Sequence, residues 1–171
     1  MISNVYCKVL IFACANTILL SCSNHRPDKM TEAESSSIEN EIRNVSDKIT
    51  GYSERAELDS FLSFYDNSPE FLHFSSDGTM RNYEELKKIC TEYYTTLKEQ
   101  KIVTIREKIH VLDTSLVVFG WTGNIVAHFK NGDTMIMKNY SITNLFKKTG
   151  SNWKIIHSHE SALPPEIIKK E

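Results

Sequence analysis

The spacing of apolar residues along the chain changes from helical to alternating close to residue 100. Before that point, apolar side chains recur every three or four residues in three stretches, which predicts three helices. Ser36 with Glu39 has the spacing of a capping box at the start of the first helix. Ser53 can cap the second helix, and Asn82 with Glu85 can cap the third. The apolar positions are Ile38, Ile42, Val45, Ile49 and Tyr52, then Leu58, Phe61, Leu62 and Tyr65, then Leu86, Ile89, Cys90, Tyr93 and Leu97.

After residue 101 the alternating pattern predicts an antiparallel meander of four strands. Val103, Ile105, Ile109 and Val111 mark the buried side of the first strand. Asn131-Gly132 is a hairpin signal between the second and third strands. The strands are predicted over residues 103–111, 116–129, 134–147 and 153–161, with one short strand earlier, at 70–75, before a turn at 76–79. Helices first and strands last predict an α+β fold in which a sheet curls over the helices.

Composition and charge restrict the possible functions. The 171 residues allow one ordinary domain, and the net charge of −2 comes without a basic run, so no nucleic-acid partner is expected. The sequence contains no phosphate-binding loop, no dinucleotide fingerprint and no clustered Cys/His spacing. We therefore expect neither a cofactor nor a bound metal.

The first 35 residues differ from the rest of the chain. Residues 1–21 have one basic residue and then a short apolar run, which is the pattern of a signal peptide. Leu19-Leu20-Ser21-Cys22 resembles the bacterial lipobox, so we expect a lipid on Cys22, followed by a polar tether over residues 22–35. This predicts a lipid anchor in the bacterial cell envelope, facing the periplasm, as the chain's only membrane contact. Cys90 is then the single remaining thiol, and we interpret it as a small core residue.

The tail of the predicted sheet, Trp153-Lys154-Ile155-Ile156-His157-Ser158-His159-Glu160-Ser161, resembles the NTF2-like superfamily, and within it the SnoaL-like domains. The stretches 59–65, 74–78 and 142–146 extend the similarity to nearly all of residues 38–164. We therefore place the domain at residues 36–165 and a tail at 166–171. The resemblance implies a cone, in which three N-terminal helices pack inside a curved antiparallel sheet and leave a cavity, and it implies a homodimer. Members include isomerases, dehydratases and pure dimerisation modules, so the fold alone assigns no function.

Two acidic residues are candidate catalytic groups. In the similar association domain of calmodulin-dependent kinase, pocket arginines stand where this chain has Asn144 and Glu160, which implies that an arginine-based carboxylate site is absent. Burial would raise the pKa of Glu160 and make it a possible base. Asp59, in the early helices, could instead pair with His73, as in the dehydratase relatives.

Strand periodicity places His157 and His159 on one face with Trp153 and Ile155, and places Ser158 and Glu160 on the other. The two histidines could supply metal ligands, with His128 as a third, but framework positions are the favoured interpretation. Glu107 either is a cavity carboxylate or marks where its strand leaves the core. The expected ligand-binding residues are Trp121, Tyr140, Asn144, His157, Ser158, His159 and Glu160.

From these residues we expect a lipoprotein that binds a small, partly apolar molecule in its cavity and performs no assigned reaction. The first alternative is a cofactor-independent enzyme of the SnoaL or ketosteroid-isomerase kind. The second alternative is an interaction module that acts only by dimerisation. A filled cavity would favour this last possibility.

Overall fold

The computed structural model describes residues 30–171, so the predicted signal peptide and Cys22 lie outside the described residues. The helices are α1 (Glu32–Glu54), α2 (Leu58–Leu62) and α3 (Tyr83–Thr96). The strands are β1 (Leu72–Phe74), β2 (Met80–Arg81), β3 (Leu97–Val111), β4 (Leu116–Phe129), β5 (Thr134–Thr149), β6 (Asn152–Ser161) and β7 (Glu166–Ile168). Within residues 30–171, no helix is both long enough and apolar enough to cross a membrane.

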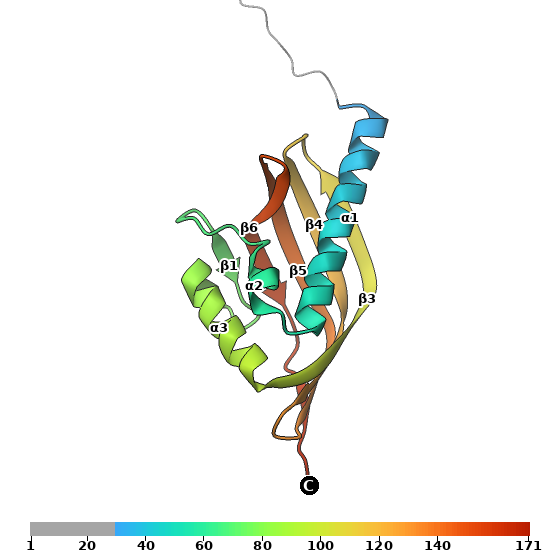
Figure 1. Cartoon of the computed structure of the whole chain (residues 1–171). Coiled ribbons are helices and arrows are strands. Elements are labelled where there is room, and N and C mark those ends of the chain that lie inside the picture. The colour runs from blue at the N-terminus through green and yellow to red at the C-terminus, as the bar shows by residue number, and fades with distance from the viewer. Residues whose placement is uncertain (1–29) are drawn as a thin grey trace, which may run out of the picture.

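The strands form one curved sheet in the order β2-β1-β6-β5-β4-β3, and the helices lie on one side of it (Figure 1). The predicted meander is confirmed, because β3, β4, β5 and β6 pair as successive antiparallel neighbours. The short strand β1 adds to the edge of β6 in parallel, and β2 pairs back onto β1. The predicted α+β fold with helices inside a curved sheet is therefore present. Strand β7, in the stretch predicted as a tail, pairs with the start of β5.

The first helix begins earlier than the capping signal at Ser36 and Glu39 predicted. Thr31 is the N-cap, and it forms a capping box with Glu34. The last four residues of the predicted tether, 32–35, are therefore helical. Helix α1 also continues past Gly51 to Glu54, so Ser53 lies in its last turn and does not cap the second helix. The predicted cap of the third helix at Asn82 and Glu85 is confirmed.

The end of α1 has the hydrogen-bond pattern of a Schellman motif. The backbone N–H of Glu57 donates to the Tyr52 carbonyl at 2.9 Å, and that of Ala56 donates to the Ser53 carbonyl at 3.1 Å. Ala56 has a φ of 55°, in the left-handed region where glycine is usual. This turn stops α1 and redirects the chain into α2.

Bulges bend the sheet at one level across three strands. The β3–β4 register shifts between Thr104 and Arg106, and the β4–β5 register shifts after Gly123. In β5, Asn139 has a φ of 55°, and its N–H donates to Asn124 Oδ1 at 3.0 Å. Each bulge adds a residue to one strand, which increases the local twist and curls the sheet around the helices.

The bulge in β3 corrects the predicted burial of that strand. Ile109 is buried as expected, but the extra residue reverses the alternation, so Val103 and Ile105 lie on the outer face with 51% and 54% of their surface exposed. The inward positions before the bulge are Gln100 and Ile102, which line the cavity described below.

A further bulge, in β6, corrects the predicted faces of the last strand. Leu145 pairs with His157 and Phe146 pairs with Ile155, so Ile156 is the extra residue. Ser158, which is fully buried, therefore shares the inner face with Ile155. His157 and His159 lie on the outer face, where both rings contact Phe74, with centroids 5.8 Å away.

The main core lies between α1 and the inner face of the sheet. Ile38 and Ile42 of α1 pack against buried residues of four strands: Ile109, Val117, Phe119, Phe146, Trp153 and Ile155. Glu41 fastens this end of the helix, because its Oε2 accepts from Trp153 Nε1 at 2.7 Å and from Lys148 Nζ at 2.8 Å. Along the second half of α1, the core gives way to a cavity between the helix and the sheet.

Candidate functional site

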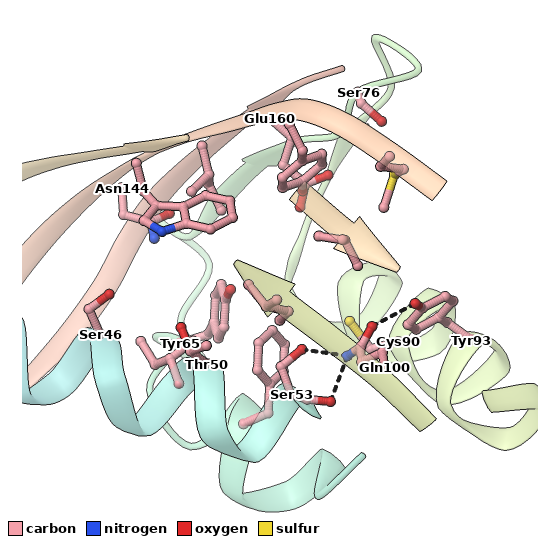
Figure 2. A pocket seen from close by; sticks show the side chains of 18 of the residues that line it. Ser46, Thr50, Ser53, Tyr65, Ser76, Cys90, Tyr93, Gln100, Asn144 and Glu160 are labelled. Carbon is pink, nitrogen blue, oxygen red and sulfur yellow. Dashed lines mark hydrogen bonds between the residues drawn. The ribbon is translucent and has the colours of Figure 1, made fainter. Parts of the chain in front are cut away.

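A cavity of about 380 Å³ separates the second half of α1 from the inner face of the sheet, with α2 and α3 closing its sides (Figure 2). Most of its lining is apolar and comes from every layer of the fold. The apolar lining residues are Ile49, Phe61, Ile89, Ile102, Phe119, Trp121, Ile125, Met137, Ile142 and Phe146. A volume in this range, with a largely apolar wall and a few polar groups, is typical of small-molecule sites.

One polar cluster of the cavity is satisfied internally. Gln100 Nε2 donates to the carbonyl oxygen and the hydroxyl of Ser53, at 2.6 and 3.0 Å, and Tyr93 donates to Gln100 Oε1 at 2.7 Å. Figure 2 shows these bonds joining α1, β3 and α3. Tyr94 also donates to Ser53 Oγ at 2.9 Å. The cluster ties three elements together, so its hydrogen-bonding groups are largely engaged within the protein.

A second polar group surrounds Glu160, at the end of β6. Burial raises the pKa of the Glu160 carboxyl above its usual value, and the neighbouring Tyr140 hydroxyl and Ser76 backbone N–H partly offset this rise. Burial likewise raises the pKa of Tyr140 well above 10, so its hydroxyl stays protonated and able to donate. The site therefore holds a carboxyl group that can exchange a proton closer to neutral pH than an exposed glutamate can.

His73 lies immediately behind Glu160. Its Nε2 is 3.8 Å from Glu160 Oε1 and 2.9 Å from Ser75 Oγ, while its Nδ1 is buried without a hydrogen-bond partner. Burial lowers the pKa of His73 to about 4, and the nearby positive charge of Arg81 contributes to this shift. The imidazole is therefore neutral at pH 7. Arg81 itself pairs with Asp77 at 3.0 Å.

His73, Ser158 and Asn144 form a buried row across three neighbouring strands. Ser158 is the register partner both of His73 on β1 and of Asn144 on β5, so all three side chains share the inner face. Their exposed fractions are 1%, 0% and 5%. Each retains one buried atom without a hydrogen-bond partner: His73 Nδ1, Ser158 Oγ and Asn144 Oδ1. Of these residues, Asn144 lines the cavity.

The structure brings together four of the seven expected ligand-binding residues. Trp121, Tyr140, Asn144 and Glu160 all line the cavity. Trp121 and Tyr140 meet edge to face, with ring centroids 6.3 Å apart, and Trp121 Nε1 donates to Thr104 Oγ1 at 2.8 Å. These contacts orient the indole towards the cavity.

The other expected residues are placed elsewhere. His157 and His159 are on the outer face, and Ser158 is buried in the row beside Asn144 without lining the cavity. Asp59 is exposed on α2 and does not line the cavity either. The suggested pair of Asp59 with His73 is therefore replaced by the contact between Glu160 and His73.

The remaining chemical candidates have structural partners. His128 Nδ1 lies 2.9 Å from Thr134 Oγ1, and within residues 30–171 no group of three His, Cys, Asp or Glu side chains could hold a metal ion. Glu107 pairs with Arg43 of α1 and does not line the cavity. It is therefore not a cavity carboxylate, and its strand still lies beside α1 at this position.

Cys90 was interpreted as a core residue, and it packs against the main core while also lining the cavity. Burial, together with the charge of Glu160, raises the pKa of its thiol to about 12. A thiol with such a pKa is not a thiolate at neutral pH and is a poor nucleophile. It therefore forms part of the wall and does not supply a reactive group.

Sequence reasoning missed the contribution of α1 and the role of His73. Ser46 and Thr50 of α1 line the cavity beside Ile49. Their helical spacing on the border of the apolar stripe was visible in the sequence, but nothing there distinguished a cavity wall from a solvent-facing edge. His73 could be placed on a strand, but its position beside Glu160 depends on the parallel pairing of β1 with β6.

The family model of the SnoaL-like domain matches residues 42–165. Several solved structures share the fold at low sequence identity. A provisionally named scytalone dehydratase from Novosphingobium aromaticivorans is 6% identical, with a TM-score of 0.72 over 82% of this chain and 94% of its own. A hexachlorocyclohexane dehydrochlorinase from Novosphingobium barchaimii is 5% identical, with a TM-score of 0.66 over 81% and 94%. An NTF2-like superfamily protein from Salmonella enterica is 18% identical, with a TM-score of 0.67 over 76% and 94%. No curated protein sequence matches the chain.

Proposed function

The chain belongs to the SnoaL-like domain family of the NTF2-like superfamily, and from this premise we propose that it binds a small, partly apolar molecule in the cavity between α1 and the sheet. The observation that carries the proposal is the open space of about 380 Å³ lined by ten apolar side chains, with Asn144 and Glu160 placed among them. A purely structural domain gains stability by filling such a space, because an unfilled apolar cavity costs free energy. A ligand would bury this surface and recover that cost.

A pair of substitutions on α1 tests the proposal. Thr50 lines the cavity, so Thr50→Trp puts an indole into the space, whereas Lys48→Trp puts the same side chain on the exposed side of the helix. We expect the neutral fluorescent probe N-phenyl-1-naphthylamine to bind the wild type and Lys48→Trp but not Thr50→Trp. Equal binding to all three proteins would show that the probe binds elsewhere and would count against a ligand cavity.

A second candidate function is acid–base catalysis of the isomerase or dehydratase type. The specific observation in its favour is the Glu160 carboxyl, which has a raised pKa, lines the cavity and lies 3.8 Å from His73. A carboxylate whose pKa is raised and which faces an apolar space can abstract a proton from a bound substrate. The scytalone dehydratase and dehydrochlorinase among the similar structures make this reaction class a reasonable one to assay.

The enzymatic alternative is tested by Glu160→Gln, with Asp59→Asn as the matched control on the exposed surface. If the domain is an enzyme, Glu160→Gln removes turnover and leaves the fold intact, as circular dichroism would show, while Asp59→Asn retains activity. Turnover that survives Glu160→Gln excludes this residue as the base.

Homodimerisation through the outer sheet face is a further proposal. Val103 and Ile105 expose apolar surface side by side on β3, and exposed apolar groups of this kind favour association. Sedimentation velocity on the wild type should give a dimer, and Ile105→Lys should shift it towards monomer. A wild-type monomer at high concentration would refute the dimer.

Anchoring in a bacterial envelope is proposed from the sequence of residues 19–22 alone. We propose that a lipid on Cys22 holds the domain at a membrane facing the periplasm. The polar residues that follow Cys22 would then separate the domain from that surface.

A further inference from the structure

We infer that the cavity binds an apolar amine, and that the Glu160 carboxylate pairs with the ammonium group of this ligand. The inference rests on the proposed binding function and adds the chemical class of the ligand. In concrete terms, the ligand has an apolar body and carries one protonated nitrogen at the end that meets β6.

The Glu160 side chain can be reached from the cavity. It lines the cavity and keeps 23% of its surface exposed, whereas Asn144 Oδ1 and Ser158 Oγ are sealed by the surrounding protein. Ser76, which is exposed, lines the cavity on the same side (Figure 2). A charged group bound beside Glu160 therefore keeps part of its hydration, which reduces the cost of burying it.

Within the part of the chain that the structure describes, no Lys or Arg lines the cavity. The guanidinium of Arg81 is held by Asp77 at 3.0 Å. His73 Nε2 is 3.8 Å from Glu160 Oε1, but the ring is neutral at pH 7 because burial lowers its pKa to about 4. A half-buried carboxylate without a cationic partner has lost hydration, and a cation on the ligand would offset this loss. An anionic ligand would instead add repulsion between like charges.

Aromatic rings lie close to the carboxylate. Burial raises the pKa of Tyr65 and of Tyr140 well above 10, and the negative charge of Glu160 adds to both shifts, so both phenols lie near it. Both also line the cavity. An ammonium group is attracted by a carboxylate and by neighbouring aromatic rings, whereas a neutral hydroxyl can only donate a hydrogen bond to the carboxylate. The surroundings of Glu160 therefore favour an amine.

The register of the sheet defines how the ligand lies. Trp121 on β4 pairs with Ile142 on β5, and Ile142 pairs with Glu160 on β6, so these three residues form one row on the cavity wall. Two strand spacings separate the ends of the row, which is about 10 Å. An apolar body of two fused rings packed over Trp121 and Ile142 therefore brings a substituent to the carboxylate.

Three compounds of one ring system test the inference on the full-length chain. 2-(Aminomethyl)naphthalene is a cation at neutral pH, 2-(hydroxymethyl)naphthalene is its neutral analogue, and 2-naphthoate is an anion. Binding is followed by titration with two-dimensional NMR of the tryptophan indole N–H groups. The chain has two tryptophans: Trp121 lines the cavity, whereas Trp153 is bonded to Glu41 outside it and serves as the internal control.

We expect the amine to shift the Trp121 signal without shifting that of Trp153, and to bind about tenfold tighter than the alcohol, with the anion weakest. If the alcohol or the anion moves the Trp121 signal with equal or higher affinity, the inference is wrong and the proposed binding function stands. If none of the three compounds moves that signal, both are wrong.

Removing the charge of Glu160 tests its assignment. Glu160→Gln keeps the size of the side chain, so the preference for the amine over the alcohol should fall from about tenfold to near onefold. Glu92→Gln removes the same charge from the exposed side of α3, outside the cavity, and should keep the tenfold preference. An unchanged Trp153 signal in both variants shows that the fold is retained. A preference that survives in Glu160→Gln, or that is lost equally in Glu92→Gln, would overturn the assignment.

Discussion

Acid should weaken the fold through His73, which anchors the short strand β1 beside the cavity. The side chain is 1% exposed, and burial lowers its pKa from 6.5 to about 4. Protonation in the folded state would place a charge on a ring whose Nδ1 has no partner. In the unfolded chain the imidazole is not confined in this way, so it binds a proton at a higher pH than it does in the folded protein.

The size of the effect follows from the two pKa values. Because the folded-state pKa is depressed, the stability that His73 contributes is fully present above about pH 6.5 and is lost as the pH falls towards 4. Proton linkage with these values gives a loss of about 2.5 kcal/mol between about pH 7 and about pH 4.5. Glu160 acts in the opposite direction, because its raised pKa makes ionisation costly and favours the fold at low pH. The contribution of His73 is therefore obtained by comparing the wild type with a variant that lacks this histidine.

The assay is urea unfolding, followed by circular dichroism, at about pH 7 and about pH 4.5. His73→Phe keeps an aromatic ring on β1 but cannot be protonated, so its free energy of unfolding should fall less than that of the wild type, by about 2.5 kcal/mol. His110→Gln removes an exposed histidine and should behave as the wild type does. Equal losses of stability in the wild type and His73→Phe would refute the reasoning.

Three further substitutions test separate parts of the account. Ala56→Gly should raise the free energy of unfolding by about 1 kcal/mol in urea titrations, because glycine adopts the left-handed φ of 55° without strain; a loss of stability would contradict the Schellman turn. Gly123→Ala should displace Trp121 and weaken probe binding, since the added Cβ would lie 2.5 Å from the Val103 carbonyl and closer still to the indole; an unchanged indole NMR signal would count against this packing. Cys22→Ala should leave the protein unlipidated and released from membranes on cell fractionation, and continued membrane association would contradict the lipid anchor.

The regular part of the fold could be predicted from the sequence because periodicity is a local property. Alternation after residue 101 identified the strands, and the hairpin at Asn131-Gly132 formed where predicted, with Gly132 at a φ of 96°. The third helix had one clear cap at Asn82. For the first helix, two stretches had the capping-box spacing, and the pair at Thr31 was the one used, which lengthened α1 into the predicted tether.

Bulges limited what the sequence could predict about the site. A single extra residue at Ile156 turned His157 and His159 outward and Ser158 inward, because the side-chain period of a strand is two. The same effect exposed Val103 and Ile105. Neither bulge has a glycine or proline at the extra residue to reveal it. Asn144 and Glu160 were identified because the family resemblance supplied their register, whereas His73 depends on pairing between strands distant in sequence.

Native mass spectrometry tests the central claim, a ligand cavity between α1 and the sheet, most directly. The wild type and Thr50→Trp would be purified gently from the protein's own host and compared for bound mass. The account predicts a reproducible additional mass on the wild type that is absent from Thr50→Trp, because the introduced indole occupies the cavity. Bare protein in both samples, or the same additional mass on both, would contradict it.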